Sequence, residues 1–330
     1  MLIGFFKSSY LVQYGMLLLL GVVLWLGSFL HPAAMPEPEF PLLVPGYQVL
    51  YNLLANTGLL NVLLAFLLTM SGSVLFNHAM AGYDLAPKNS LVPAMVFLIL
   101  ISSSKHLLLL NPIIIPLILM IITLIFLFGI YTKEEPYSEV FYVGFLVAFG
   151  SFFYFPVIFF FLLIFLTFFV FRIYFWREWI IAIGGFLTPY LFLWVYYFWI
   201  DSLRLAFDEY IDFFAGIAIL KLDYNYSIPG FLIVSLIFLL FIWSFIRLAG
   251  DLNEKVISVR KRYWSVIWFF ILSVSSFIFS GISYQFHQIF ILMAASVFIS
   301  YWLCELKRLK WVEIYMAVLI LLILVNNLIW

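Results

Sequence analysis

Residues 11–30 read LVQYGMLLLLGVVLWLGSFL, and none of these 20 side chains is charged. A helix of this length measures about 30 Å, which matches the thickness of the hydrocarbon core of a bilayer. Lys7 precedes the run, as in a secretory signal peptide, but the apolar region of such a peptide has only about 7–15 residues. We therefore expect residues 11–30 to form a retained first transmembrane helix.

The rest of the chain has the same apolar character. Of the 330 residues, 67% are hydrophobic and 10% are charged, whereas soluble domains carry about 25% charged residues. A chain of this composition cannot build a polar surface, so we expect a single transmembrane domain over residues 1–330. The net charge is zero, and nothing in it indicates a nucleic-acid partner.

Apolar runs separated by short polar breaks predict about 11 transmembrane helices. Lipid leaves backbone groups no partner outside their own segment, and the runs lack the alternation of barrel strands, so the predicted fold is an all-α polytopic bundle. One helix over residues 139–171 would measure about 50 Å, so we expect a tight hairpin that breaks between Gly150 and Pro156. The predicted crossings are residues 11–30, 57–77, 90–104, 113–131, 139–151, 156–171, 180–200, 228–247, 264–283, 289–303 and 312–329.

The distribution of Lys and Arg predicts the sidedness, because these residues accumulate in cytoplasmic loops. With the N-terminus inside and the C-terminus outside, thirteen of the 16 Lys and Arg residues fall on the inner face. They include Arg260–Arg262, which we place in a cytoplasmic loop near anionic lipid. The outer face keeps Lys105, Arg204 and Lys221. The aromatic belt of the outer interface is expected at Tyr190, Trp194, Tyr196, Tyr197 and Trp199.

The first of two long outer segments covers residues 31–56. It begins with HPAAMPEPEFP, which the prolines make stiff and extended, and its only carboxylates are Glu37 and Glu39. Apolar residues then recur at helical spacing and predict a short helix that lies in the interface plane. These residues are Val49, Leu50, Leu53 and Leu54.

The second outer segment, Asp201–Ser227, carries Arg204 and Asp208 one helical turn apart. This spacing is typical of an amphipathic surface helix with ordinary ion pairs; the functional alternative is that Arg204 contacts an anionic head group. Lys105 and His106 lie at a tight outer turn, where they either cap a helix hairpin or contact a phosphate. The histidines have no ligand spacing, so no metal site is expected.

Several motifs follow one another in a recognisable order. The acidic outer loop and its interfacial helix precede a short hairpin, the run YVGFLVAFGSFFYFP at residues 142–156 and the turn FRIYFWREW at residues 171–179. This order resembles the N-terminal membrane module of the GT-C superfamily, polytopic glycosyltransferases that use polyprenyl-phosphate-linked sugars. The GT-C-like module would cover residues 1–227, with additional transmembrane helices in residues 228–330. The motifs REW and FLTPY are similar to an uncharacterised bacterial membrane family of unknown function.

The resemblance implies a location in the bacterial inner membrane and a site on its outer face. In those enzymes a carboxylate of the first outer loop is the general base on the acceptor hydroxyl, and basic outer residues hold the lipid phosphate. The matching carboxylates are Glu37 or Glu39. Lys105, His106 and Arg204 are available by location to bind the polyprenyl-phosphate carrier.

Two functions are therefore open. One is a lipid-linked transferase at the outer face; the other is a non-catalytic membrane subunit of an envelope assembly or protein-export complex, with envelope proteins as partners. The small loops and the prolines of residues 32–36, which separate the first helix from the acidic residues, favour the second. A transporter is disfavoured because no charged residue lies in the middle of a predicted span. No cofactor is expected, because the sequence lacks a phosphate-binding glycine loop, a nucleophile elbow and a zinc motif.

Overall fold

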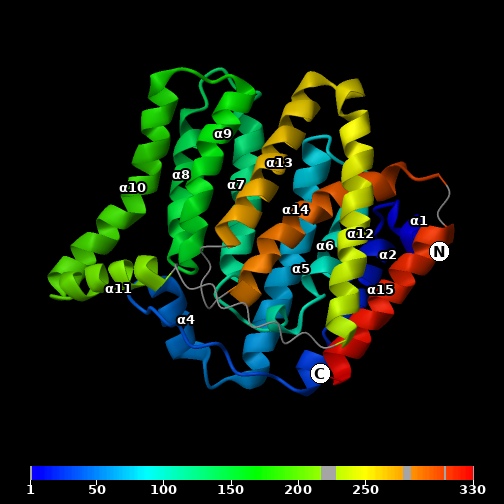
Figure 1. The fold of residues 1–330 in the computed structure, drawn as a ribbon, viewed down its shortest axis with the longest axis horizontal. Coiled ribbons are helices and arrows are strands. Elements are labelled where there is room, and N and C mark those ends of the chain that lie inside the picture. Colours follow the sequence, from blue (N-terminus) through cyan, green and yellow to red (C-terminus); the bar gives the residue numbers. More distant parts are fainter. Residues whose placement is uncertain (1, 217–227, 278–283, 308–309, 330) are drawn as a thin grey trace.

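The computed structural model describes residues 2–216, 228–277, 284–307 and 310–329. Within these ranges the regular structure is entirely helical, and the helices pack side by side into one bundle (Figure 1). In chain order they are α1 (Leu2–Phe6), α2 (Leu11–Leu24), α3 (Leu26–Leu30), α4 (Pro45–Leu54), α5 (Gly58–Gly82), α6 (Val92–Ile101), η1 (Lys105–Leu107), α7 (Ile114–Ile130), α8 (Tyr137–Ser151), η2 (Phe155–Phe160), α9 (Phe161–Phe171), α10 (Trp176–Trp199), α11 (Leu203–Gly216), α12 (Ile228–Asp251), η3 (Leu252–Glu254), α13 (Ile257–Phe277), α14 (Tyr284–Glu305) and α15 (Lys310–Ile329).

Five stretches of helix in the described ranges are long and apolar enough to cross a bilayer. They belong to α5, α10, α12 with η3, α14 and α15. Shorter apolar helices, of 10–17 residues, include α2, α6, α7, α8 and η2 with α9. The chain is therefore an all-α membrane protein, as the composition predicts. The number of crossings and the GT-C-like arrangement stay predictions.

The first predicted helix is interrupted, which corrects the expectation of one helix over residues 11–30. The helix breaks at Trp25, between α2 and α3. The side-chain amide of Asn327 donates to the carbonyl of Leu24 over 3.2 Å and to that of Ser102 over 3.1 Å, while the Trp25 indole donates to the Ser102 hydroxyl over 3.1 Å. A side chain inserted at a helix end in this way replaces the regular ladder and permits a break.

The predicted hairpin and interfacial helix are both present as helical elements. The chain breaks between Ser151 and Phe155, so residues 139–171 are not one helix. The helix after the first outer loop, α4, buries Tyr47, whereas Val49 and Leu53 are exposed. An apolar side exposed in this way suits a helix that lies at the interface, where acyl chains can cover it.

Helices α8 and α10 approach closely because glycines face the partner backbone. A Cβ atom at Gly144 would collide with the carbonyl of Ala182, and one at Gly185 would collide with the carbonyl of Phe141. Small residues that let two backbones meet are the usual device for helix association in lipid, where no hydrophobic driving force joins the helices.

Cations cap helix C-termini at one end of the bundle, which we call the basic end. The last carbonyls of a helix lack intrahelical donors and carry partial negative charge, so a nearby Lys or Arg stabilises them. Three such cations come from distant parts of the chain. The hydrogen bonds run from Lys7 to the Leu306 carbonyl beyond α14 (2.6 Å), from Lys261 to the Phe171 carbonyl of α9 (3.3 Å) and from Arg262 to the Tyr83 carbonyl beyond α5 (2.9 Å).

The position of Arg260–Arg262 corrects the prediction of a cytoplasmic loop. These residues lie in the first two turns of α13, which begins at Ile257. From this helix the Arg262 side chain reaches the carbonyl of Tyr83, next to the end of α5, and is buried in the packed interior. Lys221 and Arg308 lie outside the described residues.

The packing of α10 predicts opposite effects for two adjacent glycines. Replacement Gly185→Ala should lower the free energy of unfolding by about 1–3 kcal/mol, because the added methyl group meets rigid backbone. The matched control, Gly184→Ala, has nothing within 4 Å of its Cβ and should be neutral or stabilise by about 0.5–1 kcal/mol through helix propensity. Thermal unfolding in mild detergent measures both. Equal melting temperatures for the two variants would contradict the close approach.

Candidate functional site

Loop 31–44, α4 and α11 lie together at the end of the bundle opposite the basic end. Figure 1 shows α4 beside α11 along the lower side, with α10 leading down to them. All five sequence-predicted site residues belong to segments outside the long helices. Their positions decide whether they form one site.

Loop 31–44 is fastened to α10 and α11, and we call it the clamped loop. One carboxylate oxygen of Glu209 accepts hydrogen bonds from the amides of Leu42 (2.9 Å) and Leu43 (3.0 Å). The Tyr197 hydroxyl donates to the Leu42 carbonyl over 2.6 Å. Desolvation raises the pKa of the Glu209 carboxyl group, although the two amides oppose this shift. The loop is thus held by partly desolvated polar groups.

Further bonds fix the first half of the clamped loop. The Tyr47 hydroxyl donates to the Pro36 carbonyl over 2.6 Å, and the side-chain amide of Asn61 donates to the Ala33 carbonyl over 3.2 Å. Met35 is buried between these points. Proline residues also restrict the backbone of the loop. The segment that carries the acidic residues is therefore fixed at both ends.

The two candidate carboxylates are presented at the surface of the clamped loop. Glu37 and Glu39 are both exposed. Partial desolvation raises the pKa of the Glu39 carboxyl group above its ordinary value of 4.5. Among the residues that the structure describes, neither carboxylate forms an ion pair with Lys105, His106 or Arg204.

Lys105 and His106 form the short helix η1 and are exposed. The structure confirms a tight turn here, because the Leu108 amide donates to the Lys105 carbonyl over 3.1 Å and the Asn111 side chain donates to the His106 carbonyl over 3.3 Å. Desolvation, followed by the charge of Lys105, lowers the pKa of the His106 imidazole. Asn111 helps to stabilise the turn, and the phosphate contact stays a prediction.

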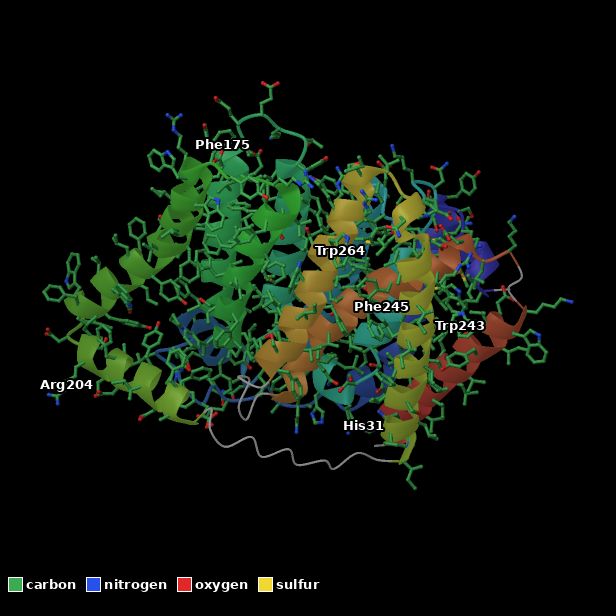
Figure 2. The ribbon with its side chains drawn as sticks, turned by 45° about the horizontal axis from the view of Figure 1, so that its top comes forward. His31, Phe175, Arg204, Trp243, Phe245 and Trp264 are labelled. Carbon is green, nitrogen blue, oxygen red and sulfur yellow. The ribbon has the colours of Figure 1, made fainter. Side chains whose placement is uncertain are left out.

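Arg204 lies in the first turn of α11 and points away from the bundle (Figure 2). The predicted pair with Asp208 is not formed, because no nitrogen–oxygen distance between them is within 4.0 Å in the described structure. Exposed pairs of this kind contribute little, so nothing holds the two side chains together. The next residue, Glu209, faces the protein instead. The rest of the second outer segment, residues 217–227, lies outside the described residues.

Sequence reasoning missed the residues that position the loop. Tyr190 and Tyr197 were expected in the aromatic belt, but both are buried. The Tyr190 hydroxyl lies 2.6 Å from the Ser151 hydroxyl, and Tyr197 holds the clamped loop. The available signal was spacing, because these two tyrosines are seven residues apart and lie on one helix face, whereas Trp199 is largely exposed.

A buried polar cluster surrounds His287 between α13, α14 and η2. The Tyr154 hydroxyl lies 3.2 Å from Nδ1, and Nε2 lies 3.1 Å from the Ser273 carbonyl and 3.0 Å from the Ser276 hydroxyl. The carbonyl can only accept, so this network assigns the proton to Nε2 and leaves Nδ1 to accept from Tyr154. Both ring nitrogens are satisfied, and the cluster is a packing element of the interior.

Comparisons with protein-family models, with curated proteins and with solved structures find no significant match for this chain.

The two hydrogen bonds that Glu209 accepts predict that this residue keeps the clamped loop ordered. Glu209→Ala leaves the amides of Leu42 and Leu43 without their acceptor, and a hydrogen bond to a charged group contributes about 1.5–3 kcal/mol. Hydrogen exchange at these two amides should therefore accelerate roughly 10- to 100-fold. Asp208→Ala, which removes an exposed neighbouring carboxylate, is the control and should leave exchange unchanged. Unaltered exchange in Glu209→Ala would show that the clamp is not needed.

Proposed function

We propose that this chain is a transferase that uses a polyprenyl-phosphate-linked sugar at the outer face of a bacterial inner membrane. The observation that supports this proposal most directly is the clamped loop, which holds Glu39 at the end of the bundle opposite the basic end. Glu39 is the general base that removes a proton from the acceptor hydroxyl. Lys105 and His106 contact the phosphate of the carrier, and Arg204 attracts that carrier from the lipid surface.

Two properties of Glu39 support this assignment. Positioned bases act only when their geometry is fixed. Tyr47, Asn61 and Tyr197 donate hydrogen bonds to the loop, and Glu209 accepts two from it. A base is also more effective when its pKa approaches the working pH. Desolvation moves the pKa of Glu39 in that direction.

A second candidate function, a non-catalytic subunit of an envelope complex, is favoured by a different observation. Helix α10 packs mainly on α8, and with α11 it projects from the edge of the bundle (Figure 1). Large exposed apolar side chains cover this projection, and a partner membrane helix can pack on them. They include Phe192, Val195, Phe198, Trp199 and Leu205.

The variant Glu39→Gln tests the transferase. It should reduce transfer from a polyprenyl-phosphate-linked sugar about 10²–10⁴-fold, the usual contribution of a general base. Glu37→Gln is the matched control on the same loop and should retain activity. In the unmodified protein the rate should fall as the pH drops through the raised pKa of Glu39, because protonation removes the base.

Purification in mild detergent, followed by mass spectrometry for bound lipid-linked sugar and for partner proteins, separates the two candidates. The transferase binds the lipid-linked sugar, and its activity needs no partner. Stable co-purification of envelope proteins, with no bound lipid-linked sugar and no effect of Glu39→Gln on envelope assembly, would reject the transferase and support the subunit.

A further inference from the structure

Four cations meet at the basic end, and we call this group the basic junction. Lys133 follows α7, Arg172 caps α9, and Lys261 and Arg262 lie on α13. They come from three regions of the chain that are far apart in sequence. Their convergence is a product of the fold.

Aromatic rings and carbonyls bring these cations together. The Lys261 ammonium lies 4.6 Å from the ring centre of Tyr131, and the Arg262 guanidinium lies 4.9 Å from that of Tyr83. The Tyr131 ring packs against Phe171, with 5.3 Å between centroids. Lys261 donates to the Phe171 carbonyl, so the next residue along the chain, Arg172, is adjacent to Lys261.

Arg172 is held in place by an unusual backbone conformation. Its φ of 64° lies in the left-handed region, where the residue ends α9. Its charge acts repulsively on Lys261. Two like charges are therefore kept close by the fold at the end of α9, at an electrostatic cost that a bound anion would remove.

The charge balance of the basic junction is incomplete. Lys133 forms an ion pair with Glu139, but Arg172, Lys261 and Arg262 form none with any residue that the structure describes. Arg262 is only 5% exposed, and its Nε has no hydrogen-bond partner among the residues that the structure describes. Asp84 attracts Arg262 without forming an ion pair with it, and a buried cation that has no direct carboxylate partner is costly.

We propose that the basic junction binds the phosphate group of an anionic phospholipid. Arginine and lysine together supply the charge and the several donors that phosphate oxygens require, and basic pockets between membrane helices are suited to lipid head groups. The aromatic corner next to Arg172 supports a lipid as the source of the phosphate. Phe175 and Trp176 are exposed there, and Phe175 projects from the α9–α10 corner (Figure 2).

Aromatic side chains of this kind sit at the level of the head groups. The basic junction lies at the opposite end of the bundle from the clamped loop, so this site is separate from the proposed transferase site. Binding of a phospholipid at the basic junction therefore does not depend on the proposed transferase activity.

The double variant Arg172→Asn with Lys261→Met tests the site. Asparagine tolerates the left-handed backbone, and methionine keeps an apolar stem over Tyr131 while removing the charge. The control, Lys88→Gln with Arg247→Gln, removes two cations from the same end of the bundle, where Lys88 pairs with Asp84 in the loop after α5 and Arg247 pairs with Asp251 on α12. The variant Arg172→Asn alone is included because it leaves the hydrogen bond from Lys261 to the Phe171 carbonyl intact.

The proteins are purified in neutral detergent and titrated with phosphatidylglycerol or phosphatidylcholine, with native mass spectrometry as the readout. The unmodified protein and the control should bind phosphatidylglycerol preferentially, and the double variant should bind it about tenfold more weakly, the loss expected for one or two charge-assisted hydrogen bonds. Arg172→Asn should lie between them. Equal binding of phosphatidylglycerol by all four proteins would overturn the proposal.

A parallel melting experiment with inorganic phosphate identifies the source of the anion. For a lipid site, phosphate should leave the melting temperature unchanged while phosphatidylglycerol raises it in the unmodified protein and the control. Stabilisation by inorganic phosphate that the double variant loses, without selective retention of phosphatidylglycerol, would overturn the lipid assignment and identify a soluble phosphate ligand.

Discussion

Helix ends inside a membrane protein have carbonyl oxygens that need donors, and this requirement organises the whole bundle. At the basic end, Lys7, Lys261 and Arg262 supply these donors, and each joins its own helix or segment to a distant one. At the opposite end neutral groups are the donors. The side-chain amide of Asn327 donates to the carbonyls of Leu24 and Ser102, and the backbone amide of Gly46 donates to the Phe152 carbonyl. The division between charged and neutral caps gives the protein one basic end.

The same requirement connects the fold to the proposed activity. The clamped loop carries carbonyls and amides at the surface of the bundle, and Glu209 and Tyr197 pair with them. A loop fixed in this way can hold a carboxylate in a constant position, which catalysis needs. The close packing of α8 and α10 through Gly144 and Gly185 supports the loop, because α10 carries Tyr197.

The apolar runs of the sequence predict much of the helical structure, because hydrophobic length is a local property. The break near Gly150, the helix from Pro45 and the helix that carries Arg204 are all predictable in this way. The roles of single residues are harder to predict from the sequence than the helices are. The interruption at Trp25 depends on Asn327, about 300 residues away, and the burial of Arg262 depends on the end of α5. Contacts between distant segments leave no periodic signal in the sequence, so neither the clamp nor the basic junction could be derived from it.

We propose that the two ends of the bundle lie on opposite sides of a lipid bilayer, with the basic end toward the cytoplasm. Single cysteines at Lys88, at the basic end, and at Asn52, on α4, test it most directly in a Cys304→Ser background. A membrane-impermeant thiol reagent should label the Asn52 position in intact bacterial cells, and the Lys88 position only in inverted membrane vesicles. Labelling of both positions from the same side would contradict the account.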